Sequence, residues 1–497
     1  MNERKASPYC HIFREGEACF AYDVNTSTLL EVEPALAAAL ALAARLSEEE
    51  IRARLGDRFP AADIGEALEA IEQGRRADGL FSAHRPQVVA RPPEPPSNCD
   101  RDLRHLVLTV SERCNLRCRY CLHGAGLPWV RGHGTRRMSL ENASRAVTYY
   151  LDRCSGAGRP AVSLYGGEPL LEFALVASIV EVIRAHPRGR DALVSIDTNG
   201  VALDARARCL VVREGLRLQV SLDGPAEIHD RHRREAAGGP THASVEANLV
   251  SLLRQDPAAA DRLSFIATLA PPFDLPAVAG YFADFPPFRA AGIDRQPSVR
   301  VGFADLTGQD WPGLADQAAA GNRQLDVLRE HYLEAIRTGT RDRLGPVERA
   351  LFEPSLIRFH KRSRARLGSE LTVGGACVLG RRKLHVDVDG VFHPCERTGR
   401  LVTLGDLETG LDPALVAART ADYFSGGSSR CADCWAVRLC GICHAHLAAG
   451  NVRSLGDLPG AVCDAERRRL EDIMKMTVRL LSLPAGCRRF MDGYELK

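Results

Sequence analysis

Between residues 103 and 310, short apolar runs alternate with longer amphipathic stretches. The short runs suit β-strands, and the stretches between them have the apolar spacing of helices. One such helix, Met138–Cys154, has Ser139 as its expected N-cap. The expected strands are Leu106–Val110, Ala161–Leu164, Leu193–Ile196, Leu216–Val220, Phe265–Leu269 and Val299–Phe303. This alternation predicts an α/β fold with a parallel sheet, whose functional groups gather where the strands end.

Residues 1–85 follow another order, in which three short strands precede three helices. The expected strands and helices are Tyr9–Arg14, Ala18–Asp23, Leu29–Val32, Pro34–Leu46, Ser47–Leu55 and Ala61–Asp78. Ser47 and Glu50 have the spacing of a capping box, and Gly79 suits the C-cap of the third helix. This order predicts a winged helix. A DNA-binding role is the alternative, but the third helix carries several glutamates, which are poorly suited to a phosphate backbone.

The rest of the chain divides at changes of composition. His84 to Asp100 contains five prolines, which predicts an extended linker over residues 86–102. Glu330 to Lys361 is expected to be helical, within a bridge over residues 311–372 that offers no candidate chemistry. The last part, residues 373–497, is rich in cysteine.

Composition narrows the class of protein. The chain has 497 residues, of which 45% are hydrophobic and 26% charged, with a net charge of +2. That balance gives no reason to expect nucleic acid or a membrane surface as a partner. The start of the chain is polar, and the longest apolar run, Ala35–Ala44, is too short to cross a bilayer. Sixteen cysteines in such a chain indicate metal ligation in a reducing compartment, and we expect a cytoplasmic protein.

Three cysteines directly follow the first strand of the alternating region. Cys114, Cys118 and Cys121 have the spacing C-x3-C-x2-C. Three thiolates can hold three irons of a [4Fe–4S] cluster and leave the fourth iron open to a small molecule. A zinc site would need a fourth ligand to complete its tetrahedron. Chance clustering is the other alternative.

At these residues the chain resembles the radical S-adenosylmethionine (SAM) superfamily. In that family the open iron binds the amino and carboxylate groups of SAM, and one electron from the cluster cleaves SAM to a 5′-deoxyadenosyl radical. The loop Tyr165-Gly-Gly-Glu-Pro169, one strand later, adds to the resemblance. It implies a partial (β/α)6 barrel over residues 103–310.

The same resemblance implies which residues contact SAM. Its candidates are Tyr120, Gly166, Gly167, Glu168, Asn199, Ser221, Asp223 and Arg233. The glycines would let the backbone approach the ligand, and Glu168 would accept a hydrogen bond from the methionyl ammonium. Ser221 is the candidate for the ribose and Arg233 for the carboxylate. Arg231 and Arg234 stay open as alternatives to Arg233.

The C-terminal cysteines resemble the SPASM extension of radical SAM enzymes, which holds two auxiliary [4Fe–4S] clusters. The resemblance assigns an outer set of four and an inner set of three: Cys431, Cys434, Cys440 and Cys463, and Cys377, Cys395 and Cys443. The last pair of the C-x2-C-x5-C-x2-C run is one residue closer than the family usually has. A zinc ribbon is the alternative. Because residues 378–394 contain no cysteine, the inner cluster is expected to lack a fourth ligand, for which Cys487 is the rival candidate.

Residues 1–85 resemble the precursor-recognition element of peptide maturases, which pairs a leader peptide with a sheet edge. The resemblance therefore implies a radical SAM/SPASM maturase that uses SAM, three [4Fe–4S] clusters and a reducing donor such as flavodoxin or ferredoxin. Its partner would be a leader-bearing peptide or small protein, with no nucleic acid and no membrane. An open inner iron suits thioether formation from a substrate cysteine. Carbon–carbon cross-linking and formylglycine formation are alternative chemistries, and a non-catalytic iron–sulfur carrier or regulator is the alternative from another class.

Overall fold

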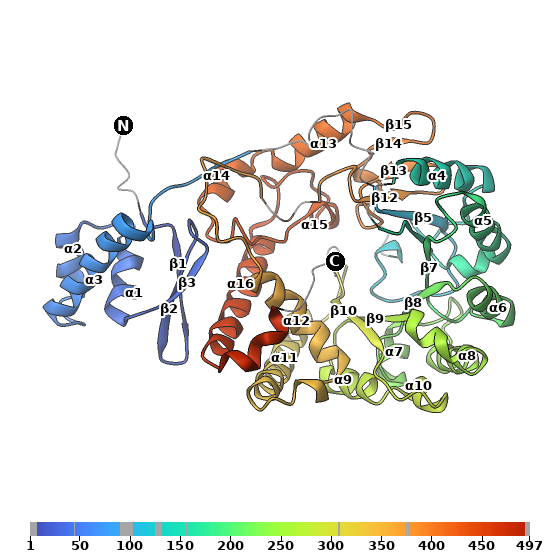
Figure 1. Ribbon diagram of the computed structural model, residues 1–497, viewed down its shortest axis with the longest axis horizontal. Helices are drawn as coiled ribbons and strands as arrows, with labels where there is room; N and C mark the ends of the chain where they lie inside the picture. Colours follow the sequence, from blue (N-terminus) through green and yellow to red (C-terminus); the bar gives the residue numbers. More distant parts are fainter. Residues whose placement is uncertain are drawn as a thin grey trace.

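The computed structural model describes residues 7–43, 45–89, 103–124, 132–154, 158–306, 309–373, 375 and 377–492. A small N-terminal unit lies at one end of an elongated molecule, and the alternating strands and helices lie at the other end (Figure 1). C-terminal helices and loops fill the space between them. No helix in the described ranges is long and apolar enough to cross a membrane.

The N-terminal unit has the predicted order of elements. Its antiparallel sheet is β1 (Cys10–Glu15), β2 (Ala18–Asp23) and β3 (Thr28–Val32), and its helices are α1 (Pro34–Leu42), α2 (Glu48–Leu55) and α3 (Ala61–Gln73). The capping box is present, because Ser47 Oγ accepts from Glu50 N at 3.3 Å and Glu50 Oε2 accepts from Ser47 N at 2.6 Å. Helix α1 ends four residues before the predicted Leu46, and α3 continues into a π-helical turn that Gly79 closes at φ 65°.

The expected parallel strands all form, each within a few residues of its predicted bounds. They are β5 (His105–Ser111), β6 (Ala161–Gly166), β7 (Leu193–Thr198), β8 (Arg217–Ser221), β9 (Leu263–Leu269) and β10 (Ser298–Phe303). The helices along them are α4 (Leu140–Arg153), α5 (Phe173–Ala185), α6 (Ala205–Arg213), α7 (Ala226–His232), α8 (His242–Gln255), α9 (Leu275–Ala283) and α10 (Pro286–Ala290). Ser139 caps α4 as predicted, accepting from Asn142 N at 3.0 Å.

The six expected strands pair in parallel with one another, and the sheet continues beyond them at its β5 edge. Its ten strands run in the order β10-β9-β8-β7-β6-β5-β12-β13-β14-β15. Strand β12 (Lys383–Val386) pairs in parallel with β5, and β13 (Val391–His393), β14 (Gly405–Asp406) and β15 (Gly410–Leu411) follow antiparallel. The open edge of β5 supplies unpaired backbone groups that another strand can satisfy. The added strands are too short to give a periodic signal.

Two expectations about the connecting segments are also corrected. Gln87–Val88, inside the predicted linker, forms β4 and pairs with β11 (Glu370–Leu371), and Val88 is buried. The proline-rich residues 90–102 lie outside the described ranges. The helical bridge is two helices, α11 (Leu314–Arg337) and α12 (Pro346–His360), and the chain turns between them at Gly339, whose φ is 71°.

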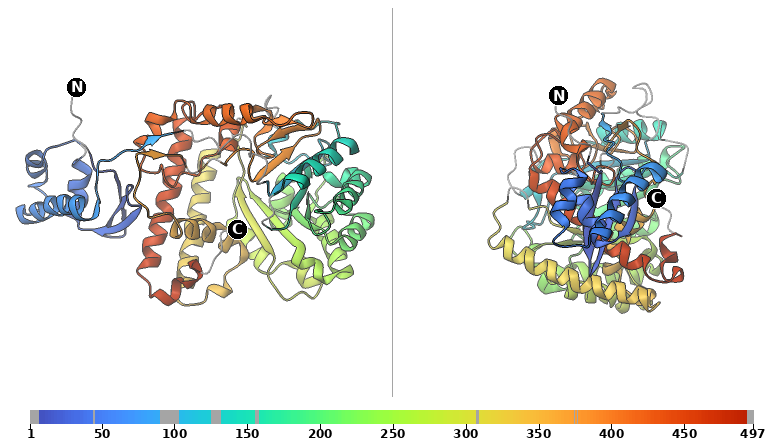
Figure 2. Two further views of the ribbon diagram at one scale, coloured as in Figure 1. Left: turned by 45° about the horizontal axis from the view of Figure 1, so that its top comes forward. Right: turned by 90° about the vertical axis from the view of Figure 1, so that its left-hand side faces the viewer.

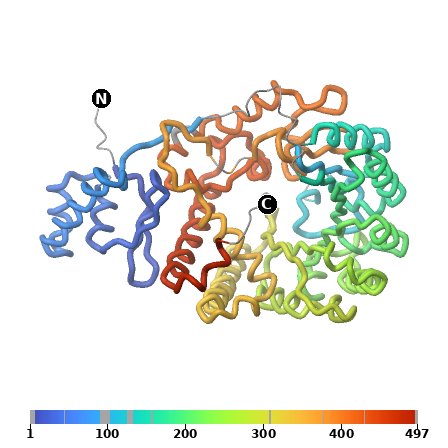
Figure 3. The backbone as a smooth tube through the Cα atoms, viewed as in Figure 1, coloured from blue at the N-terminus to red at the C-terminus, as the bar shows by residue number. Residues whose placement is uncertain are grey.

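The C-terminal region places its helices around the cysteine-bearing loops. They are α13 (Pro413–Phe424), α14 (Gly427–Ala432), α15 (His444–Ala449) and α16 (Gly460–Leu481), with a final 3₁₀ segment at Ala485–Met491. Helix α16 runs beside α12 between the N-terminal unit and the barrel (Figure 2). The backbone trace in Figure 3 shows the N-terminal unit, in blue, on one side of this helix and the barrel on the other.

Candidate active site and cysteine groups

The loop with Cys114, Cys118 and Cys121 begins where β5 ends. Cys121 acts electrostatically on both Cys114 and Cys118, and Cys114 also acts on Cys118, so the three thiols are neighbours. Polar hydrogens point at two of the sulfurs: Leu116 N is 3.4 Å and Asn199 Nδ2 3.9 Å from Cys114 Sγ, and Arg233 Nη1 is 3.9 Å from Cys118 Sγ. Such donors are typical of the surroundings of iron–sulfur clusters.

The surroundings of these thiols favour binding to an iron cluster over ionisation without a bound metal. Burial raises the pKa of the Cys118 thiol to about 12, although Arg233 lowers it. The thiol at this place would therefore lose its proton only beside a cation, and bound iron would supply that positive charge.

The Gly-Gly-Glu-Pro loop supports the cysteine loop directly. Gly167 N donates to Ser111 O at 2.8 Å, and Glu168 N donates to Arg113 O at 2.7 Å. A Cβ on Gly167 would lie 2.1 Å from Arg113 O, and one on Gly166 would lie 2.3 Å from Ser111 O. The two glycines therefore let this loop approach the protein's own backbone closely, and their expected approach to a ligand stays a prediction.

Glu168 accepts hydrogen bonds from three protein donors, and its expected contact with an ammonium group stays a prediction. Its carboxylate accepts from Leu170 N at 3.0 Å, Thr198 Oγ1 at 2.8 Å and Asn199 N at 2.7 Å. Burial raises its pKa to about 7. Glu168 therefore ties the ends of β6 and β7 together beneath the cysteine loop.

Arg233 is buried and forms an ion pair with Asp223, at 2.9 Å between Nε and Oδ2. Tyr120 donates its hydroxyl to the same carboxylate, and Thr268 N donates to Oδ1 at 2.9 Å. The guanidinium thus reaches Cys118 while its other side is held by Asp223. The expected contact of Arg233 with a SAM carboxylate stays a prediction.

The alternatives to Arg233 point elsewhere. Arg231 Nη1 donates to Pro272 O at 2.9 Å, and Arg234 Nη1 donates to Gly238 O at 2.9 Å. Ser221 ends β8 beside Ile266 of β9, at the expected edge of the sheet, and the described contacts assign it no further role.

All four cysteines of the outer set line one pocket, together with Arg467 and Glu466. Arg467 Nη1 is 3.8 Å from Cys434 Sγ, and Glu466 Oε1 accepts from Gly441 N at 2.6 Å. Four thiols around one space, with a guanidinium at a sulfur, fit a four-cysteine cluster.

The inner set is brought together by a close backbone contact. A Cβ on Gly375 would lie 2.2 Å from Ile442 O, so the segment before Cys377 packs on the loop before Cys443. Cys443 acts electrostatically on both Cys377 and Cys395, so all three are neighbours. His446 Nδ1 lies 3.3 Å from Cys443 Sγ. Three thiols gathered in this way fit three corners of a cluster.

Cys487 is not the missing fourth ligand. Cys463 lies near the start of α16, whereas Cys487 follows its last residue, Leu481. Eighteen helical residues at 1.5 Å each separate the two ends by ~27 Å. Glu466, near the start of the helix, already contacts the loop of Cys440 and Cys443 through Gly441 N at 2.6 Å, so Cys487 lies far from the inner set.

Tyr423 lies between the two C-terminal cysteine sets. It is fully buried, and its hydroxyl donates to Ile442 O at 2.8 Å. Burial raises its pKa, and cysteines of both sets, Cys440, Cys443, Cys431 and Cys377, raise it further. Tyr423 is therefore a neighbour of both sets. Among the described residues, no three His, Cys, Asp or Glu side chains converge closely enough for a single metal ion.

The concave face of the sheet holds a polar cavity that the sequence analysis missed. Strands β5 to β10 and β12 line it, with side chains that include His105, Ser163, Ser195, Asp197, Arg300 and Lys383. Glu396, the residue after Cys395, lines it too and pairs with Lys383 at 2.5 Å. The signal in the sequence is the polar residue at every second position of apolar strands, as in Ser195 and Asp197 of β7.

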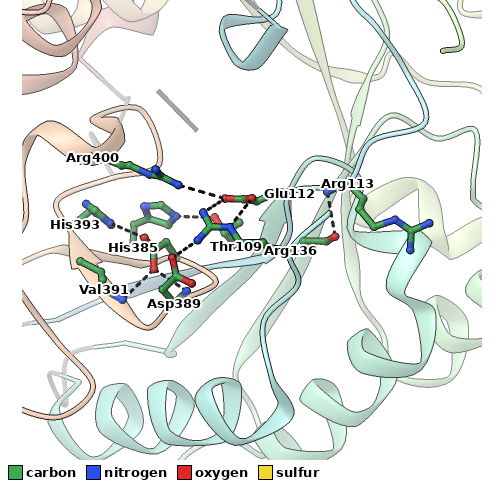
Figure 4. A network of polar contacts seen from close by, with 11 residues as sticks. Thr109, Glu112, Arg113, Arg136, His385, Asp389, Val391, His393 and Arg400 are labelled. Atoms are coloured by element: carbon green, nitrogen blue, oxygen red, sulfur yellow. Dashed lines mark hydrogen bonds and ion pairs between the residues drawn. The ribbon is translucent and has the colours of Figure 1, made fainter. Parts of the chain in front are cut away.

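A network of ion pairs joins the cysteine loop to the added strands (Figure 4). Arg136 pairs with buried Glu112 at 2.6 Å and with Asp389 at 2.5 Å. Beside it, Thr109 Oγ1 lies 2.8 Å from His385 Nε2. Glu112 is two residues before Cys114, so the network fixes the cysteine loop against the C-terminal region.

Comparisons with known proteins agree with this geometry. Residues 108–249 match the family model described as the radical SAM superfamily. The chain is 33% identical over 160 residues to "GTP 3′,8-cyclase 3" of Mycobacterium bovis, which is 32% of this chain and 40% of that protein. It is 36% identical over 116 residues to "GTP 3′,8-cyclase" of Paenarthrobacter nicotinovorans, which is 23% of this chain and 30% of that protein. The chain thus spans less than half the length of these curated relatives.

A solved structure is similar over a longer stretch. It is titled "Native anSMEcpe with bound AdoMet and Cp18Cys peptide", and it aligns with 76% of this chain and 99% of its own at a TM-score of 0.51 and 17% identity. At that identity the likeness concerns the fold alone.

Proposed function

We propose that the chain is a radical SAM enzyme, to which the match at residues 108–249 contributes the core domain, and that it modifies a leader-bearing peptide by joining a cysteine sulfur to an unactivated carbon. When bound, a [4Fe–4S] cluster and SAM would supply the abstraction of a hydrogen atom from the peptide. Cys114, Cys118 and Cys121 would hold that cluster. Tyr120, Asp223 and Arg233 would form the polar wall beside it.

The observation that carries the proposal is the shared cavity. Its lining comes from the strands of the radical SAM domain and also from Lys383 and Glu396, which belong to the region of the inner cysteines. A peptide segment in the cavity would therefore face both cysteine groups. The reaction removes a hydrogen atom and then a further electron from one substrate, so both cysteine groups have to lie within reach of that substrate.

Peptide recognition is supported by a groove on the N-terminal unit. It lies between the start of α1 and helix α3 and is lined by apolar Leu36, Phe59 and Ala67, with Asp63 and Glu66 at its rim. The apolar floor suits an amphipathic segment, and the acidic rim favours a basic one. We therefore propose a leader with Lys or Arg beside apolar residues.

A sulfur-bearing substrate is supported by the inner set of three cysteines, for which Cys487 is too distant to serve as a fourth. Carbon–carbon cross-linking is the second candidate, because the same cavity would hold it. A structure of a related fold contains AdoMet and a peptide, which agrees with a peptide substrate here.

The experiment is an anaerobic reaction of the reconstituted chain, SAM and a reductant with a cysteine-bearing peptide encoded beside its gene. Mass spectrometry should show the loss of two hydrogen atoms per cross-link and one thiol fewer for alkylation. The same peptide with serine in place of cysteine should bind and stay unmodified. A cross-link that forms in the serine peptide would overturn the thioether assignment in favour of carbon–carbon bonding.

A further inference from the structure

The carboxyl group of Asp197 lies in the cavity and has no role in the proposed function. Asp197 lies on β7 and faces the concave side of the sheet. Gln219 Nε2 donates to its Oδ1 at 2.9 Å. Within the described part of the chain, Oδ2 accepts no hydrogen bond from protein. One oxygen is thus fixed and the other is available to a molecule in the cavity.

The position of Asp197 relates it to both cysteine groups. Two residues further along β7 and its loop, Asn199 reaches Cys114 Sγ at 3.9 Å. Across the same cavity, Glu396 follows Cys395 of the inner set and acts electrostatically on Asp197. A substrate beside Asp197 would lie between the two groups.

The charges facing Asp197 come from three elements. Burial raises its pKa to about 7, and Glu396 raises it further, whereas Lys383 and Arg300 lower it. Glu396 itself is ion-paired with Lys383 at 2.5 Å, which holds it as an anion. Asp197 is therefore the carboxyl of the cavity that can both take up and release a proton near neutral pH, which is what a general base requires.

We propose that Asp197 accepts, at Oδ2, the proton that the peptide loses as the new bond forms. This inference rests on the proposed function. Making a C–S bond from C–H and S–H removes two hydrogens in total. The first leaves as an atom in the SAM-dependent step. The second leaves as a proton to Asp197 and an electron, which needs a one-electron acceptor of the iron–sulfur class such as the inner cysteines would hold. The same balance applies to a C–C bond made from two C–H bonds.

The test compares Asp197→Asn with one variant in the same cavity and one outside it. Asn keeps the size of the side chain and an acceptor for Gln219 but cannot take up a proton. Glu396→Gln removes the neighbouring charge in the cavity. Asp326→Asn changes an exposed acid on α11 that pairs with Arg329 at 2.8 Å. Peptide affinity, 5′-deoxyadenosine yield and product yield are measured for each, and infrared spectra of the protein alone are recorded between acidic and alkaline pH.

For Asp197→Asn we expect peptide affinity within about twofold of wild type, continued SAM cleavage, and about a hundredfold less product per 5′-deoxyadenosine. Asp197→Glu should recover part of the product. The infrared spectrum of wild type should contain a carboxyl band that titrates near neutral pH and is missing from Asp197→Asn. Asp326→Asn should match wild type in all readouts.

An Asp197→Asn enzyme with the wild-type product ratio would overturn the proposal. So would a Glu396→Gln enzyme that alone loses product, because the acceptor would then be Glu396. An infrared spectrum without the titrating band also overturns it, and this readout needs no peptide. Failure of wild type to modify any peptide would instead contradict the proposed function.

Discussion

At the scale of single residues, the site depends on backbone groups that approach unusually closely. The loop of Gly166 and Gly167 packs on Ser111 and Arg113, and donates two backbone hydrogen bonds to them. Asp223 then gathers Tyr120, Arg233 and Thr268 N around one carboxylate. The cysteine loop is thus held from two sides before any iron binds, which favours rapid and correct cluster assembly.

Gly167→Ala should disrupt this support. The new methyl would meet Arg113 O at 2.1 Å, so the cysteine loop must move. We expect iron bound at Cys114, Cys118 and Cys121 to fall sharply, as seen by electron paramagnetic resonance after mild reconstitution. The matched control is Gly280→Ala in α9, where no atom lies within 4 Å of the new Cβ. Its helix should gain ~1 kcal/mol. Equal iron contents in the two variants would contradict the packing account.

His229 should make stability depend on acid pH. It is buried, bonds Thr241 Oγ1 at 3.0 Å, and burial lowers its pKa to about 4. A lowered folded pKa means that the stability is present above the unfolded pKa, ~6.5, and is lost as pH falls toward 4. The contribution to unfolding free energy changes by up to ~1.4 kcal/mol per pH unit in that window.

His229→Gln cannot be protonated, so its thermal midpoint should fall less than that of wild type between pH 6.5 and 5. Replacement of exposed His84 should leave the pH profile unchanged. Identical profiles for His229→Gln and wild type would show that this histidine does not contribute.

At the scale of secondary-structure elements, β12 decides how the barrel meets the rest of the chain. It pairs in parallel with β5, so the sheet of the radical SAM domain continues into the cysteine-rich region. Arg136 then spans the join, from Glu112 beside the cysteine loop to Asp389 before β13. The register of one strand pair thus sets the distance between the first cysteines and the inner ones.

Arg136→Ala should loosen this join. Both carboxylate oxygens of buried Glu112 would lose their main hydrogen-bond partner. We expect this to lower the unfolding free energy by about 1–3 kcal/mol. Lys at this position should recover little, because an ammonium cannot bind both oxygens as a guanidinium does. Arg145→Ala is the control, since its pair with Glu408 at 2.7 Å also joins α4 to the added strands but is exposed. We expect it to cost less than ~1 kcal/mol. Equal losses in thermal unfolding would contradict the role of the buried pair.

Many of the helices and strands were predictable from the amino-acid sequence alone. Regular strand–helix alternation gave the parallel strands, and Ser47 and Ser139 gave helix starts, because caps and periodicity are local properties. The pairing of β12 with β5, and of Gln87–Val88 with Glu370–Leu371, was not predictable, since short strands carry no period and their partners are distant. Likewise the cysteine spacing indicated the three cysteine groups. Which side chains and backbone groups pair with Glu168 and Arg233 was not predictable, because that depends on tertiary contacts.

At the scale of the whole molecule, the N-terminal unit sits on the loop of the outer cysteines. Tyr9 donates its hydroxyl to Cys434 O at 2.8 Å, and His11 stacks on Trp435 at 3.9 Å between ring centroids. Arg438 Nη1 donates to Val24 O at 3.0 Å and to Asn25 O at 2.9 Å. The unit proposed to bind a leader is therefore fixed relative to the cysteine-rich region.

Arg438→Ala should release part of this contact. Hydrogen exchange of the amides in residues 9–24 should become faster, while exchange in β6 and β7 stays unchanged. Leader affinity should hold, and product yield should fall, because the bound peptide is less well directed to the cavity. Arg54→Ala, on the exposed face of α2, is the control and should alter neither readout. Faster exchange throughout the chain would point to general destabilisation instead.

The formation of 5′-deoxyadenosine by the reconstituted, reduced chain with SAM tests directly whether a cluster at Cys114, Cys118 and Cys121 cleaves SAM. Three clusters would require roughly twelve irons per chain, and this form should release 5′-deoxyadenosine. Cys114→Ala, Cys118→Ala and Cys121→Ala should each release none, while Cys209→Ala, at an exposed cysteine outside the cysteine groups, should match wild type. Normal yields from the three site variants, or none from the fully loaded wild type, would contradict the assignment of this chain's chemistry.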